Sequence, residues 1–117
     1  MDLGLKGKSV IVTGGGSNIG RAIVHAFAAE SSHITIAEID LDQGETVAGE
    51  VNSTGGDAKA IAVKTDVTDA AQVETMVSRA INEFGGVDVL VNNVGWTVDR
   101  LFMDKPSEEL EREVRLN

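Results

Sequence analysis

The chain has 117 residues, a length that fits one domain with a hydrophobic core of useful size. Hydrophobic residues make up 42% of the sequence and aromatic residues 3%, so the core must be built from Val, Ile, Leu and Ala. The absence of cysteine excludes disulfides, cysteine-ligated zinc and a thiol nucleophile. The formal net charge of −9 argues against nucleic acids and anionic membranes as partners, because both are bound by basic surfaces.

The opening residues contain no apolar segment of the kind found in a signal peptide. No stretch of the sequence approaches the length and apolarity of a membrane span. We therefore expect a cytoplasmic protein whose acidic surface keeps it soluble and whose partners are small molecules.

The first half of the chain predicts two strand–helix pairs. Val10–Val12 is a continuous apolar run, typical of a buried strand, and apolar residues at helical spacing follow from Ile19 to near Glu30. His33–Ile39 predicts the second strand. The helix expected over Leu41–Asn52 contains two glycines, each of which costs about 1 kcal/mol relative to alanine.

The second half predicts two more pairs. Ala60–Val63 is expected to be a strand that is apolar on both faces, and Val73–Phe84 has the clearest helical periodicity of the chain. Glycines end that helix, and Val87–Val91 predicts the fourth strand. Pro106 fits the first turn of a last helix that runs to the end of the sequence. The order β-α-β-α-β-α-β-α with continuously apolar strands predicts an α/β fold with a doubly wound parallel sheet.

A glycine-rich stretch joins the first strand to the first helix: Thr13-Gly14-Gly15-Gly16-Ser17-Asn18-Ile19-Gly20. At such a turn a pyrophosphate can bind free backbone N–H groups and the positive helix end, provided that no side chain holds it away. Glycines are also common in any strand-to-helix turn, but the position between strand and helix is the one that the dinucleotide fingerprint requires. The residues expected to bind the phosphates are Gly14, Gly16, Ser17, Asn18, Ile19 and Gly20.

The spacing departs from G-x-G-x-x-G, because Gly14 to Gly20 is one residue longer and Asn18 holds the middle glycine position. Asparagine is among the residues that best tolerate a positive φ, so we expect Asn18 to preserve the loop there. Its amide could also contact the phosphates. A side chain at Gly14 is expected to project into the pyrophosphate position with little loss of the fold.

The longer spacing, with Thr13 in front, resembles the T-G-x-x-x-G-x-G signature of the short-chain dehydrogenases/reductases. Three further segments match that family in order: Glu38 at the second strand, Asp66-Val67 after the third, and Asn92-Asn93-Val94-Gly95 after the fourth. All of them follow strands of a parallel sheet, where ligands of open α/β sheets bind. The resemblance covers the whole chain and implies that residues 1–117 form one NAD-binding Rossmann segment, the N-terminal half of the family's fold.

Glu38 stands 18 residues after Gly20, near the separation of about 20 expected for the acid that binds the adenosine ribose. Its carboxylate would repel a 2′-phosphate, and no Lys or Arg between Gly14 and Gly20 offsets that repulsion. NAD is therefore expected rather than NADP. Taken alone, Glu38 is equally consistent with a solvated charge at a strand end.

The resemblance implies further roles. Asp66 would cap the adenine amino group, and the segment of Asn93, Val94 and Gly95 would pack beside the adenosine half and stabilise the sheet. Two asparagines before a glycine are by themselves ordinary turn chemistry. The cofactor-binding residues expected from these segments are Asp66, Val67, Asn93, Val94 and Gly95.

The last helix resembles the one that leads to the Asn of the family's catalytic tetrad, and Asn117 has the matching position. In the family this Asn holds a water in the proton relay, while a Ser, a Tyr and a Lys complete the tetrad. The sequence has no Tyr, so we expect the 117 residues alone to have no turnover. His25 and His33 are expected to be surface or packing groups and not metal ligands.

Trp96 follows the fourth-strand motif and either borders a pocket for a bulky substrate or packs structurally. The run Asp99–Met103 resembles the 3-oxoacyl-thioester reductases and hydroxyacyl dehydrogenases of the family. The expected activity is hydride transfer between NAD(H) and a secondary alcohol or ketone, which includes such thioesters. A non-catalytic NAD-binding module or accessory subunit is the alternative.

A homo-oligomer is expected, because the family's later helices build dimers and tetramers. In the family's strand order another strand lies beyond the fourth, so Val87–Val91 is expected to present an apolar edge that recruits other chains.

Overall fold

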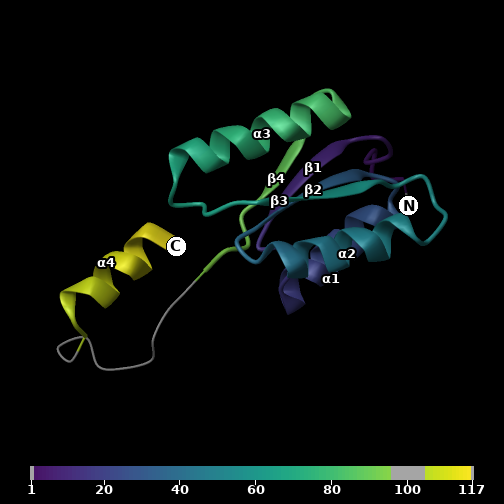
Figure 1. Ribbon diagram of the computed structural model, residues 1–117. Helices are drawn as coiled ribbons and strands as arrows, with labels where there is room; N and C mark the ends of the chain where they lie inside the picture. Colours follow the sequence, from purple (N-terminus) through teal and green to yellow (C-terminus); the bar gives the residue numbers. More distant parts are fainter. Residues whose placement is uncertain (1, 96–104, 117) are drawn as a thin grey trace.

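The computed structural model, shown in Figure 1, describes residues 2–95 and 105–116. Within these ranges one parallel sheet has the strand order β3-β2-β1-β4. Its strands are β1 (Ser9–Thr13), β2 (His33–Glu38), β3 (Ala60–Lys64) and β4 (Val89–Val91). The helices that alternate with them are α1 (Asn18–Ala29), α2 (Leu41–Asn52), α3 (Ala70–Phe84) and α4 (Ser107–Leu116). The predicted order of elements and the doubly wound parallel sheet are confirmed.

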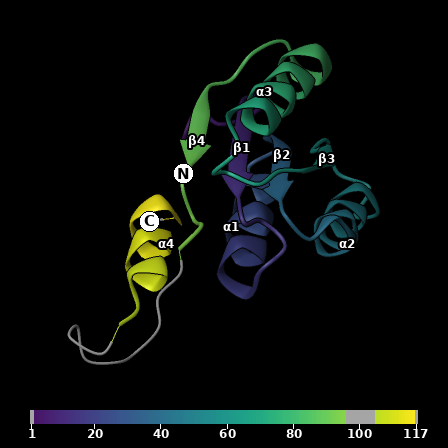
Figure 2. The ribbon, with the colours of Figure 1, turned by 60° about the vertical axis from the view of Figure 1, so that its left-hand side comes forward.

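Two helical layers enclose the sheet, with α1 and α2 on one face and α3 on the other (Figures 1 and 2). The core on the α1–α2 side includes Val10, Val12, Ile34 and Ile36 from the strands and Val24, Val47 and Val51 from the helices. The core on the α3 side is smaller and consists of Ile11, Ala37, Val63, Met76 and Ala80. Because successive strand residues point to opposite faces, the central strand β1 contributes to both cores and is buried along its whole length.

The strand order reverses at β1. From β1 the chain proceeds outward through β2 to β3, then crosses back over the α3 face to place β4 on the other side of β1. The carboxyl ends of all four parallel strands therefore lie along one edge, with a switch in direction between β1 and β4. Open α/β sheets form their ligand-binding crevice at such a point.

Some boundaries differ from the prediction. α3 begins at Ala70, before the predicted Val73, because the carboxylate of Asp69 accepts hydrogen bonds from the N–H groups at the start of the helix. Val87 lies outside β4, and Pro106 precedes α4, where its carbonyl accepts the N–H groups of Glu109 and Leu110. β3, predicted to be apolar on both faces, is an edge strand that is only partly buried.

The expectation for Asn18 is wrong. Asn18 is the first residue of α1, and Ser17 is the N-cap, with a φ of −79° and a side chain that accepts the N–H of Gly20. Among the described residues, Ser31 is the single non-glycine residue with a positive φ. In the loop the positive φ, 67°, belongs to Gly14. The additional loop residue is therefore accommodated by a serine cap, a role for which serine is among the preferred residues.

The loop glycines are required by contacts within the protein itself. A Cβ on Gly15 would lie 2.8 Å from Cγ2 of Ile36, and one on Gly16 would lie 2.9 Å from Cβ of Gln43. A Cβ on Gly20 would overlap the carbonyl oxygen of Gly14. The expectation that a side chain at Gly14 costs the fold little is also wrong, because its positive φ strains any L-residue there.

We predict opposite effects on stability for alanine at two helical glycines. Gly20→Ala should lower the free energy of unfolding by about 2 kcal/mol, because its Cβ collides with backbone that cannot move away easily. Gly49→Ala in α2, where nothing lies within 4 Å of the added Cβ, should raise that free energy by about 0.5–1 kcal/mol. Urea denaturation of both variants measures the difference. A loss of stability in both variants, or in neither, would contradict the conclusion that close backbone contact requires glycine at position 20 but not at position 49.

β4 lies at the edge of the sheet and pairs with β1 on its inner side. Leu90 is 55% exposed and Val87 is 40% exposed, so the predicted apolar edge is confirmed for this chain. Self-association through that edge stays a prediction. No helix within the described residues has the length and apolarity that crossing a membrane requires.

Leu90→Lys should reduce self-association of the 117-residue chain, because a charge on an exposed edge opposes pairing with another strand. Ile81→Lys is the matched control, since Ile81 is similarly exposed (47%) but lies on α3. Light scattering of both variants and the parent gives the mass in solution. A parent that is monomeric, or an equal effect of the two substitutions, would refute association through β4.

Candidate functional site

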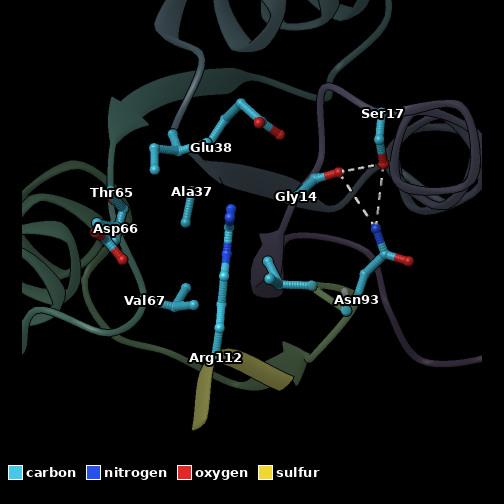
Figure 3. Close-up of a pocket in the computed structure, with 12 residues that line it drawn as sticks. Gly14, Ser17, Ala37, Glu38, Thr65, Asp66, Val67, Asn93 and Arg112 are labelled. Carbon is cyan, nitrogen blue, oxygen red and sulfur yellow. Dashed lines mark hydrogen bonds between the residues drawn. The ribbon is translucent and has the colours of Figure 1, made fainter. Parts of the chain in front are cut away.

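A cavity of about 260 Å³ opens at the carboxyl ends of the strands (Figure 3). Its walls come from the segments that follow the four strands and from α4. The lining residues are Gly14, Ser17, Ala37, Glu38, Ile39, Thr65, Asp66, Val67, Asn93, Val94, Gly95 and Arg112. The cavity thus lies where the reversal of strand order predicts a ligand.

The structure brings most of the predicted cofactor-binding residues together. Gly14, Ser17, Glu38, Asp66, Val67, Asn93, Val94 and Gly95 all line the cavity. Gly16, Asn18, Ile19 and Gly20 are not among its lining residues. Gly20 is buried, whereas Asn18 and Ile19 are exposed in the first turn of α1.

Three predictions fall on other parts of the chain. The proposed tetrad residue Asn117, the candidate pocket residue Trp96 and the run Asp99–Met103 lie outside the described residues.

Asn93 connects the end of β4 to the glycine-rich loop. Its backbone N–H donates to Oγ1 of Thr13 at 2.9 Å, and its Nδ2 donates to the carbonyl of Gly14 at 3.2 Å and to Oγ of Ser17 at 3.4 Å. Ser17 Oγ in turn donates to the Gly14 carbonyl at 2.7 Å. These bonds fix the loop against β4 and make Asn93 a structural part of the cavity wall.

Glu38 ends β2 and is only 8% exposed. Its Oε2 accepts the N–H of Gly16 at 3.1 Å, and its Oε1 accepts the N–H of Asp40 at 3.4 Å. A buried carboxylate requires such donors to offset its lost hydration. Each oxygen has further lone pairs, so Glu38 can hold the loop and still accept hydrogen bonds from a ligand in the cavity.

Asp66 follows β3, and its Oδ1 accepts the side-chain hydroxyl of Thr68 at 2.6 Å and the N–H of Thr68 at 2.9 Å. The hydroxyl hydrogen bond, followed by the N–H bond, lowers the pKa of Asp66 below its usual value. Both bonds reach Oδ1, so Oδ2 can accept a donor from a ligand. Asp66 is therefore held ionised as a hydrogen-bond acceptor in the cavity wall.

The remaining walls of the cavity are mostly apolar and come from Ala37, Ile39, Val67 and Val94. A flat ring fits against aliphatic side chains of this kind, while Glu38 and Asp66 offer acceptors to hydroxyl and amino groups. Together with the glycine turn at Gly14, this set of groups fits the adenosine and phosphate parts of a dinucleotide.

Sequence reasoning missed Ala37, Ile39, Thr65 and Arg112 as lining residues. The first three are direct neighbours of predicted residues at strand ends, so their positions in the sequence could have indicated them. Arg112 carries no such signal, because its place depends on where α4 lies.

The two histidines have packing and surface roles outside the cavity, as predicted. The ring of His33 stacks on Phe84 with a centroid separation of 5.2 Å, and Nε2 of His25 lies 3.0 Å from Oε1 of Glu50. Within residues 2–95 and 105–116 no group of three His, Asp or Glu side chains is placed to hold a metal ion.

The fold, and a cavity at the point where the strand order reverses, define a protein of the doubly wound α/β class. Residues 8–117 match the family described as short chain dehydrogenase. The chain therefore belongs to the short-chain dehydrogenase family of oxidoreductases, whose members generally bind nicotinamide cofactors.

Curated relatives and solved structures agree with this assignment. An uncharacterized oxidoreductase of Thermotoga maritima is 42% identical over 113 residues, which cover 97% of this chain and 43% of that protein. The 7alpha-hydroxysteroid dehydrogenase of Escherichia coli is 34% identical over 116 residues, 99% of this chain and 44% of the enzyme. A short-chain type dehydrogenase/reductase from Mycobacterium marinum superposes with a TM-score of 0.89 at 32% identity, covering 96% of this chain and 43% of that one. The chain spans less than half the length of these relatives.

Thr68→Val should raise the pKa of Asp66 towards its usual value, because it removes the hydroxyl hydrogen bond while keeping the shape of the side chain. NMR titration of the Asp66 carboxyl carbon measures the shift. Thr75→Val is the matched control, since the Thr75 hydroxyl bonds only to a carbonyl within α3. An unchanged Asp66 pKa in Thr68→Val would show that the hydroxyl is not its main cause.

Proposed function

We propose that residues 1–117 form the cofactor-binding Rossmann segment of an NAD-dependent short-chain dehydrogenase/reductase. The observation that carries the proposal is the cavity, in which a glycine turn, the carboxylates of Glu38 and Asp66 and an apolar wall converge. A nicotinamide cofactor bound there would supply the hydride acceptor or donor of the reaction. The chain's own residues bind and orient that cofactor.

The pyrophosphate is proposed to lie at the start of α1. Gly14 and Ser17 line the cavity on this side, and the first turn of α1 presents backbone N–H groups from Asn18 and Ile19. Gly16 and Gly20 allow the close packing that holds the turn in this position.

The adenosine is proposed to lie between the ends of β2, β3 and β4. Glu38 would accept hydrogen bonds from the ribose hydroxyls, and Asp66 would accept one from the adenine amino group. Val67, Asn93, Val94 and Gly95 complete this part of the cavity. Glu38 would repel a 2′-phosphate, which supports NAD over NADP.

The proposed reaction is hydride transfer between NAD(H) and a secondary alcohol or ketone in a cytoplasmic homo-oligomer. One curated relative is named as a hydroxysteroid dehydrogenase, which supports an alcohol substrate. Asn117 is the proposed tetrad residue of this chain. The alternative of a non-catalytic NAD-binding module finds no support, because the matched relatives are named as oxidoreductases and dehydrogenases.

NAD should bind more tightly than NADP, because Glu38 repels the 2′-phosphate of NADP. Glu38→Ala should narrow that preference by about tenfold, which corresponds to about 1.4 kcal/mol of repulsion at a partly solvated site. Calorimetric titration of the whole protein with both cofactors measures the two dissociation constants. Glu38→Gln separates the charge from the size of the side chain, and Glu45→Ala on the exposed face of α2 is the control. If the Glu38 variants and the parent have the same ratio of NAD to NADP dissociation constants, Glu38 does not select the cofactor and only holds the loop.

A further inference from the structure

Arg112 of α4 reaches into the candidate cofactor cavity. Figure 3 shows its side chain extended from α4 into the space that Ala37 and Val67 also line. Among the described residues that line this cavity, Arg112 is the single one with a basic side chain. All the others come from the glycine turn or the segments at the strand ends, so α4 provides a wall from outside the sheet.

A second cavity, of about 350 Å³, adjoins the candidate cofactor cavity. The residues that line both cavities indicate whether Arg112 lies on the proposed phosphate side or on the proposed adenosine side. Ile39, Asp66 and Arg112 line both cavities. Gly14 and Ser17, on the proposed phosphate side, line only the first. Arg112 therefore belongs with Ile39 and Asp66, in the half proposed for the adenosine.

The chemistry of that half favours a flat, neutral base as the group that Arg112 contacts. A guanidinium is planar and permanently charged, and it stacks on the faces of aromatic rings. Ala37, Ile39 and Val67 offer an aliphatic surface for the other face of such a ring. Glu38 and Asp66 in the same cavity would oppose a phosphate group there but not an uncharged base.

We propose that the guanidinium of Arg112 stacks on the adenine base of the cofactor and makes α4 part of the cofactor site. The inference rests on the proposed function, because it assumes that a dinucleotide occupies this cavity. It adds a residue from outside the motifs that suggested the site. It also gives α4 a reason for its position, since α4 packs against none of the other helices and strands in the described part of the chain.

Titration of the whole protein with NAD, AMP and nicotinamide mononucleotide tests the proposal. AMP and the mononucleotide both carry a phosphate, but only AMP carries adenine. Arg112→Ala should weaken the binding of NAD and AMP by about tenfold, the effect of one lost cation–π stack, and leave the mononucleotide unchanged. Arg115→Ala is the matched control, because Arg115 lies on α4 and lines only the second cavity.

Arg112→Lys distinguishes stacking from simple charge. Lysine keeps the charge but not the plane, so this variant should recover only a small part of the lost affinity. Full recovery, or an equal loss of affinity for AMP and the mononucleotide, would assign Arg112 to a phosphate and overturn the stacking. If the parent binds NAD and AMP while Arg112→Ala binds them equally well, this inference fails and the proposed function stands. A parent that binds neither would overturn both.

Discussion

The hydrogen bonds between the end of β4 and the turn after β1 are the constraint on which the rest of the site depends. Thr13 Oγ1 accepts the N–H of Asn93 and donates to the carbonyl of Val91, and Asn93 binds the carbonyl of Gly14. These groups are about 80 residues apart in the sequence, so they meet only where β4 pairs with β1. On its other side the turn is held by Glu38 through the N–H of Gly16. A loop fixed from both neighbouring strands has its shape before any ligand arrives, which lowers the entropy lost on binding.

The fold followed from the sequence because its signals are local and repeated. Apolar runs of strand length alternate with helical periodicity, and a parallel sheet is the arrangement that buries both. Most of the candidate site could be predicted too, because the residues that follow parallel strands lie along one edge of the sheet.

Two features were not predicted, for different reasons. Asn18 was predicted to replace a glycine. Ser17 before it is a strong helix cap, and that local signal already predicts Asn18 as the first residue of α1. Arg112 depends on the path of α4 in space, for which no local pattern exists.

The glycines show how one residue type can satisfy two requirements at the same place. A side chain in the glycine turn would keep phosphates away from the backbone N–H groups. In this chain a side chain at Gly15, Gly16 or Gly20 already conflicts with Ile36, Gln43 or the Gly14 carbonyl. The backbone can approach a ligand closely because the loop is packed closely against β2 and α2. Glu38 also has two roles, because its carboxylate fixes the loop through the N–H of Gly16 and lines the cavity. Replacing Glu38 by alanine therefore changes affinity partly by releasing the loop. Replacing it by glutamine keeps this part small, because glutamine retains an acceptor oxygen.

The charged groups are not evenly distributed over the cavity, because Glu38, Asp66 and Arg112 lie on its proposed adenosine side. The protein is strongly acidic, and Glu38 and Asp66 add negative charge to the cavity, yet a dinucleotide brings two phosphate charges. The start of α1 would compensate on the loop side through its backbone N–H groups, and Val24 holds this helix in the core. On the proposed adenosine side the compensating charge would come from Arg112 of α4, which within residues 2–95 and 105–116 does not pack on the sheet. The proposed phosphate half is thus formed by the loop and the sheet, whereas the proposed adenosine half is completed by a side chain from α4. In the proposed complex, affinity for the phosphates would depend on the sheet and its glycine turn, and affinity for the adenosine would depend also on the position of α4.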